Sequence, residues 1–150
     1  MFLPSLALVL HELSAIVWVG GMFFALLVLR PATGPLDPAA RLALWRRVLG
    51  GFFAWVFAAV ALLLISGFTL FLGGYAGGLH VHVMMAIGII MMLIFFHVYF
   101  APWKRFRRAL DRGDSAAAAV QLDQIRILVM INLVLGLVTA AIGASGRFWG

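Results

Sequence analysis

The chain has 150 residues, of which 65% are hydrophobic and only 11% are charged, and its mean hydropathy is +1.14. Soluble domains usually carry about 25% charged and about 45–50% apolar residues, so this composition excludes a soluble globular enzyme. The sequence contains no cysteine, which excludes disulfides, thiolate metal sites and cysteine nucleophiles. Its net charge of +6 is concentrated between apolar runs, as in membrane proteins, so we expect no nucleic-acid partner.

Four apolar segments reach the length of about 20 residues that a membrane span needs. They are Pro4–Leu29, Leu49–Leu72, Leu79–Ala101 and Ile127–Ala144, and loops rich in proline, glycine or charge separate them. The first segment lacks a basic start and a cleavage site, which favours a retained span over a signal peptide. Since backbone groups in the bilayer must pair within their own segment, the sequence predicts an all-α, integral membrane four-helix bundle. Residues 1–150 would form one transmembrane domain.

Basic residues predict the orientation of this bundle. The first and third loops contain nearly all of them, whereas the outer side contains only Arg147. The positive-inside rule therefore places those loops in the cytoplasm and both termini outside, as in a multi-pass protein of the bacterial inner membrane. Aromatic and basic residues within 37–47 and 103–124 predict short interfacial helices in these loops.

Small residues recur at helical spacing in the fourth span. Gly136, Ala140 and Ala144 lie on one stripe, with Gly143 beside them. Such stripes let helices approach closely. The pattern fits either packing inside the bundle or a homodimer face, and the sequence leaves both open.

His11 and His82 share a predicted depth. Each stands 20 residues before a proline at the cytoplasmic boundary, Pro31 and Pro102 respectively. Because the first and third spans run in the same direction, both imidazoles should lie about 30 Å above that boundary. Two histidines at one depth on neighbouring parallel helices have the geometry of axial haem ligation. The pairing predicts haem b near the outer face, with His11 and His82 as iron ligands.

Further residues would complete such a haem site. Trp18 and Met85 follow the two histidines on the same helix faces and could pack against the macrocycle. Arg147 is the basic residue on the outer side and is the candidate partner for the propionates, with Tyr75 or Ser145 beside it. Ligation by two histidines leaves iron without an open position. This favours electron transfer with a quinone or a periplasmic redox protein.

Copper binding or transport is the alternative from a different class of function. Imidazole and thioether ligands suit copper. The sequence offers them at His80, His82, His11 and Met84 or Met85. Met22, Met91 and Met92 could continue a path inward. If residue 80 is already helical, His80 and His82 point about 160° apart and cannot bind one ion together. His97 is expected about 22 Å deeper than His82 and Glu12 on another face than His11, so neither has an assigned role, and Asn132 is expected to bridge helices.

Three segments of the sequence, two of which contain histidine, resemble a known family. They are HELSAIVWVGGMFFALLVLRP from His11, RRVLGGFFAWVFAAVALLLISG from Arg46, and LHVHVMMAIGIIMMLIFFHVYFAPW from Leu79. Together they resemble small four-helix bacterial proteins of the copper-resistance D family, and the resemblance covers nearly the whole chain. It implies a multi-pass membrane protein connected with copper.

The first and third spans also resemble the bacterial membrane protoporphyrinogen oxidase, a haem b protein. His11, Trp18 and Gly20 match its first helix, and Leu79, His80 and His97 match its third. The lysine on which that family's oxidase activity depends is replaced by His82, and its tyrosine by Phe96. The resemblance implies a haem-binding redox protein or oxidoreductase, with porphyrinogen oxidation as a further alternative.

Overall fold

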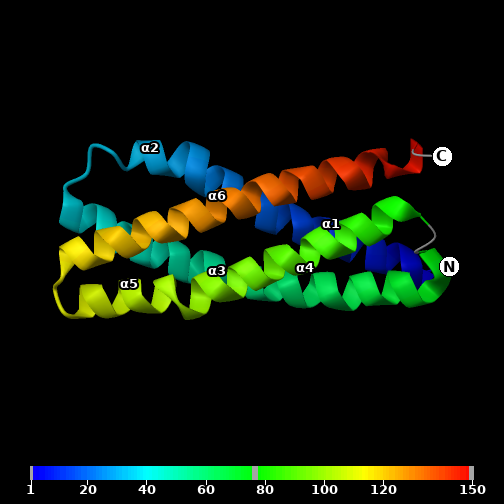
Figure 1. Cartoon of the computed structure of the whole chain (residues 1–150), viewed down its shortest axis with the longest axis horizontal. Coiled ribbons are helices and arrows are strands. Elements are labelled where there is room, and N and C mark those ends of the chain that lie inside the picture. Colours follow the sequence, from blue (N-terminus) through cyan, green and yellow to red (C-terminus); the bar gives the residue numbers. More distant parts are fainter. Residues whose placement is uncertain (1, 76–77, 149–150) are drawn as a thin grey trace.

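The computed structural model describes residues 2–75 and 78–148, except for the side chains of Phe2, Tyr75 and Arg147. Every regular element in this part of the chain is helical (Figure 1). The elements are α1 (Phe2–Phe23), the π-helix η1 (Phe24–Leu29), α2 (Arg30–Ala32), α3 (Pro38–Leu70), the π-helix η2 (Phe71–Tyr75), α4 (Leu79–Phe100), α5 (Pro102–Asp111), α6 (Ser115–Ser145) and the 3₁₀ turn η3 (Gly146–Phe148). Four helical segments are long and apolar enough to cross a membrane. The prediction of an all-α membrane bundle is confirmed.

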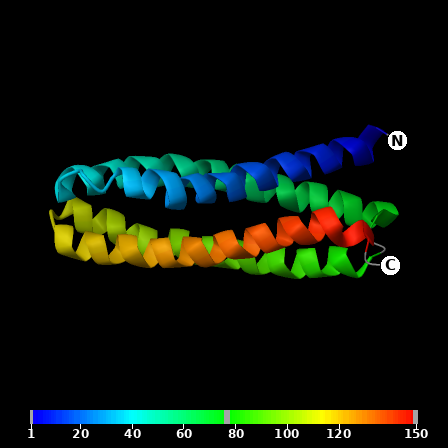
Figure 2. The ribbon, with the colours of Figure 1, turned by 90° about the horizontal axis from the view of Figure 1, so that it is seen from above.

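The helices form two hairpins that pack against each other. α1 packs along α3, α4 and α5 pack along α6, and α6 also contacts α1. Both chain ends lie at the same end of the molecule as η2 and the start of α4 (Figure 1). We call this the outer end and the opposite end the cytoplasmic end, following the positive-inside rule. Seen from above, the first part of α1 diverges from the α4–α6 hairpin towards the outer end (Figure 2).

The cytoplasmic ends of the helices differ from the prediction. The segment 37–47 is not a separate interfacial helix, because α3 runs without a break from Pro38 to Leu70. Asp37 caps its first turn by accepting hydrogen bonds from the amides of Ala39 and Ala40. Residues 103–124 are divided between α5 and α6 by a turn in which Gly113 adopts a φ of 73°. A residue with a side chain would be strained there.

These extensions are held by side chains that face the bundle. Trp103, Phe106 and Ala109 on α5 are buried, as are Ala118 and Ile125 on α6. α5 continues α4 in the direction of the bundle axis instead of lying across it (Figure 1). Its apolar face therefore covers α6, and the bundle extends beyond the predicted spans at this end.

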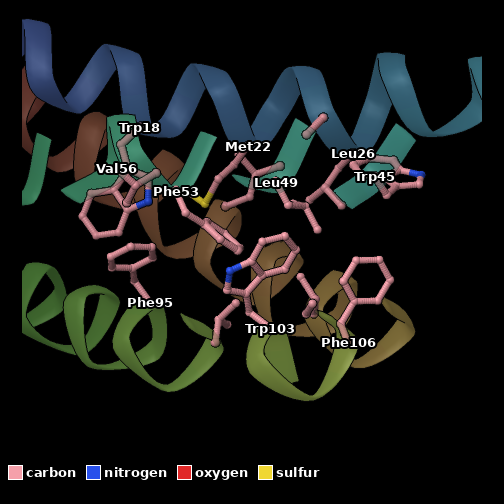
Figure 3. Close-up of a cluster of buried hydrophobic side chains, with 14 of the residues drawn as sticks. Trp18, Met22, Leu26, Trp45, Leu49, Phe53, Val56, Phe95, Trp103 and Phe106 are labelled. Atoms are coloured by element: carbon pink, nitrogen blue, oxygen red, sulfur yellow. The ribbon is translucent and has the colours of Figure 1, made fainter. Parts of the chain in front are cut away.

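The core is an aromatic cluster at the middle and cytoplasmic levels (Figure 3). The Phe53 ring lies 5.8 Å from Phe95 and 5.3 Å from Trp103, both nearly edge to face. Trp18 reaches Phe95 from α1, with ring centroids 6.1 Å apart. Edge-to-face pairs are favourable beyond the area they bury. Large rings thus fill the space between the hairpins and fix their separation.

Small residues of α6 receive methionine side chains of α4. A Cβ atom at Gly136 would lie 3.1 Å from Cε of Met91 and 2.8 Å from Val19 of α1. A Cβ atom at Gly143 would lie 2.9 Å from Cε of Met84. Gly136 and Gly143 therefore serve packing inside the bundle, the first of the two uses that the sequence left open. Ala140 and Ala144 are exposed, and a homodimer through them stays a prediction.

Asn132 also joins α6 to α4, as predicted. Its Nδ2 donates a hydrogen bond of 3.3 Å to the carbonyl of Met91, and the side chain is buried. Its Oδ1 is buried with no hydrogen-bond partner among the described residues. Most of the large hydrophobic side chains outside the cluster face outward, where a bilayer would cover them.

Candidate metal site at the outer end

His80 occupies a position between two backbone segments at the start of α4. A Cβ atom placed on Gly78 or on Gly146 would overlap the imidazole. Gly78 is the N-cap of α4, and Gly146 is the buried residue that ends α6. The ring therefore fits only because both neighbours lack a side chain. The C-terminal end of α6 and the start of α4 together fix its place.

Met84 lies one turn further along α4, on the same face as His80. Residues separated by four positions on a helix are neighbours on its surface. The thioether of Met84 packs on Gly143, since a Cβ atom there would lie 3.4 Å from Sδ. α4 thus presents an imidazole and a thioether to α6, each opposite a glycine. Met85 lies off this face and is 42% exposed.

His11 is held by α3. Its Nδ1 lies 3.0 Å from Oγ of Ser66, and its ring also contacts Gly67. The hydroxyl of Ser66 donates its single proton to the carbonyl of Leu62. This hydrogen-bond pattern assigns the Nδ1–H tautomer to a neutral His11, which donates to Ser66 and keeps a lone pair on Nε2. Metal-binding histidines are commonly oriented in this way by a partner on the other nitrogen.

His82 shows the same arrangement with a backbone acceptor. Its Nδ1 lies 3.2 Å from the carbonyl of Gly78, which can only accept. A neutral His82 therefore also carries its proton on Nδ1 and a lone pair on Nε2. The ring lies 6.2 Å from Phe71 at the outer end of α3. His82 is exposed, in contrast to the packed ring of His80.

The structure places the predicted haem ligands at the same end but gives them different partners. His11 contacts α3 at Ser66 and Gly67, whereas His82 lies beside Phe71, about 6 to 8 Å further along the helix. No contact between the two imidazoles is found among the described residues. Haem ligation by this pair stays a prediction that the contacts do not support.

The other predicted haem contacts lie elsewhere. Trp18 is 3% exposed and packs on Phe95 in the aromatic cluster (Figure 3). The side chain of Arg147 lies outside the described residues, as does that of Tyr75. His97 is exposed near the cytoplasmic end of α4, and Glu12 is exposed on α1. Neither lies with the His80 and Met84 pair.

The described residues contain no cluster of three or more histidine, cysteine, aspartate or glutamate side chains that could hold a metal ion. Imidazole and thioether are the groups that α4 presents together, and both are copper ligands. Among the described residues, His80 and Met84 are therefore the candidate pair for a copper site.

The role of the residues that position these side chains was not predicted from the sequence. Gly146 and Gly143 determine where His80 and Met84 pack, and Ser66 determines the orientation of His11. The signal for Gly143 was its place beside the small-residue stripe, and nothing in the sequence pointed to Gly146. The stripe did not indicate which helix it would face. Nothing in the sequence connected Ser66 with His11, 55 residues away.

Comparison with known families supports the connection with copper that the sequence suggested as an alternative to haem. A family model described as copper resistance protein D matches residues 46–145. The match covers α3 from Arg46 onward, α4, α5 and α6, so it includes His80, His82 and Met84 but not His11. No curated protein and no solved structure matches the chain.

Proposed function

The chain belongs to the copper resistance protein D family, and we propose on this basis that it binds copper at the outer end of its membrane bundle, as a multi-pass protein of the bacterial inner membrane. His80 and Met84 of α4 would be the first ligands. His82, one turn from the helix start and exposed, would serve as an entry ligand. The single observation that carries the proposal is the placement of His80 and Met84 on one face of α4, His80 against Gly146 at the C-cap of α6 and Met84 against Gly143 within α6.

The chemistry of these donors favours the reduced ion. Cu(I) is soft and accepts thioether and imidazole ligands, whereas hard cations prefer oxygen. The described outer end offers no cluster of carboxylates. A site built on α4 would therefore discriminate against Mg²⁺ and Ca²⁺ by ligand type.

The surrounding residues would hold these donors in place. Gly78 and Gly146 confine the His80 ring, and Gly143 gives room to the Met84 side chain. His82 and His11 each have Nδ1 bound to an acceptor that is fixed to the backbone. A metal ion approaching either ring would meet a lone pair on Nε2. His11 would join the site only if α1 moved towards α4, so it is the less supported ligand.

The proposal is tested by Cu(I) titration of the full chain in detergent, in competition with a coloured chelator. We expect His80→Ala and Met84→Leu each to lower the affinity about tenfold or more, because each removes a ligand. Met85→Leu is the matched control for the thioether and His97→Ala for the imidazole. Neither control should change the affinity.

Two results would contradict the proposal. The first is a wild-type chain that binds no Cu(I) above the detergent blank. The second is an equal loss in Met85→Leu and Met84→Leu, which would show that the α4 face does not determine binding. An absorption spectrum of the same preparation tests haem: a Soret band that His11→Ala and His82→Ala abolish would restore the haem hypothesis.

A further inference from the structure

A large cavity lies at the cytoplasmic end, at the opposite end of the bundle from His11, His80 and His82. It has a volume of about 770 Å³ and lies between η1 and α2 on one side and the first turns of α3 and α6 on the other. Ligand sites commonly enclose about 300–1,000 Å³. The cavity is therefore large enough for part of a small molecule or of a lipid.

One part of this cavity is basic. Arg30, Arg41 and Arg126 line it, and the single acidic side chain in its wall is Asp123. Asp123 is already paired with Arg126, with Oδ1 and Nη1 2.7 Å apart. Arg30 and Arg41 form no ion pair with a described residue. The cavity thus carries net positive charge and two guanidinium groups able to accept an anion.

The other part is apolar and extends towards the membrane centre. Leu26, Leu49, Phe52 and Val129 line it. Along α3 the lining runs from Pro38 to Phe52, a length of about 21 Å. The basic residues of α3 and α2 lie nearer the cytoplasmic turns, and the apolar ones lie deeper. The cavity therefore has a polar end at headgroup level and a long apolar end within the bilayer.

We propose that this cavity binds a phospholipid with an anionic headgroup from the cytoplasmic leaflet. Arg30 and Arg41 would contact the phosphate, and one acyl chain would lie along Leu49, Phe52 and Val129. The cytoplasmic leaflet is rich in anionic lipid, and basic pockets between helices on that side suit such headgroups. A headgroup alone would leave the apolar part empty, so the shape favours the whole lipid over a free phosphate compound. The proposal is independent of copper binding.

The test is a titration of the full chain in detergent with phosphatidylglycerol and, separately, with phosphatidylcholine of the same acyl chains. Native mass spectrometry measures the bound lipid. We expect phosphatidylglycerol to bind more tightly. In the double variant Arg30→Gln, Arg41→Gln this preference should fall by about fivefold for each arginine removed. Ala119→Trp, at a lining residue, should fill the cavity and abolish binding of both lipids there.

The matched control removes the same charge elsewhere. Arg105 and Arg108 are exposed on α5 and do not line the cavity, so Arg105→Gln, Arg108→Gln should keep the preference. If both double variants lose the preference for phosphatidylglycerol equally, the preference comes from general surface charge and the proposal is overturned. Equal binding of the two lipids, or full competition by glycerol 3-phosphate, would also overturn it. If the first double variant does not fold, Ala119→Trp decides: unchanged lipid binding would overturn the proposal.

Discussion

Gly146→Ala is the sharpest test of how the outer end holds its ligand. The backbone of Gly146 has φ −58° and ψ −30°, which alanine adopts without strain. The added methyl group would overlap the His80 ring. To regain ordinary van der Waals separation the ring has to move by roughly 1 Å. The substitution therefore displaces one proposed ligand without removing it.

The expected loss in Cu(I) affinity follows from that displacement. Changes in residues that orient a metal ligand typically lower the affinity about 10- to 100-fold. We expect Gly146→Ala to lower the Cu(I) affinity about tenfold. Gly143→Ala should cost less, because the end of the Met84 side chain is flexible and can shift. Gly88→Ala, on α4 itself with nothing within 4 Å of the new Cβ atom, is the control and should bind as the wild type does.

The measurement is the competition titration with a coloured chelator, with circular dichroism to verify helix content. The predicted order of affinity loss is Gly146→Ala, then Gly143→Ala, then Gly88→Ala. An unchanged affinity in Gly146→Ala would show that His80 is not a ligand in the position described. An equal loss in Gly88→Ala would show that any added bulk in the bundle weakens binding, and that Gly146 and Gly143 do not position the ligands.

Three further predictions concern stability, each measured as the free energy of unfolding of the purified chain in mixed micelles. Phe53→Ala should cost about 3–5 kcal/mol, because Phe53 is 2% exposed at the centre of the aromatic cluster; a cost below about 1 kcal/mol would contradict that packing. Asn132→Leu should stabilise by about 1 kcal/mol, because it removes an unpaired buried Oδ1 and loses only one weak hydrogen bond; a loss of stability would mean that Oδ1 has a partner. Arg46→Gln should cost less than about 1 kcal/mol, because its pair with Asp111 is exposed on both sides; a larger cost would show that the pair holds α3 to α5.

Hydropathy was sufficient to predict the spans, because the bilayer imposes length and helicity on any apolar segment. It was not sufficient for the cytoplasmic extensions. The charged residues between 103 and 112 suggested a helix lying in the interface, yet Trp103, Phe106 and Ala109 pack on α6. Amphipathicity shows that one face is apolar. It does not show whether lipid or another helix covers that face.

The haem hypothesis shows a second limit. Equal depth of His11 and His82 is a statement about one dimension, the bilayer normal. Whether two spans are neighbours depends on the order of helices around the bundle. Short turns place consecutive spans side by side, so the first and third tend to lie across the bundle from each other. Here α1 packs on α3 while α4 packs on α6, and the two histidines accordingly find different partners.

The same core favours binding of copper at the proposed site over conduction of the ion through the bundle. On the α4 face towards α6, the next thioether after Met84 is Met91, about 10 Å away along the helix, too far for an ion to pass directly between them. Below it, the cavity lined by Trp18, Phe53 and Phe95 has a volume of only about 10 Å³, which is too small for a hydrated ion. We therefore expect proteoliposomes to bind Cu(I) without importing it, as measured by a copper-sensitive dye inside the vesicles. Uptake faster than in protein-free vesicles, and slowed by Met91→Leu, would show instead that the methionines form a path and that the aromatic core opens.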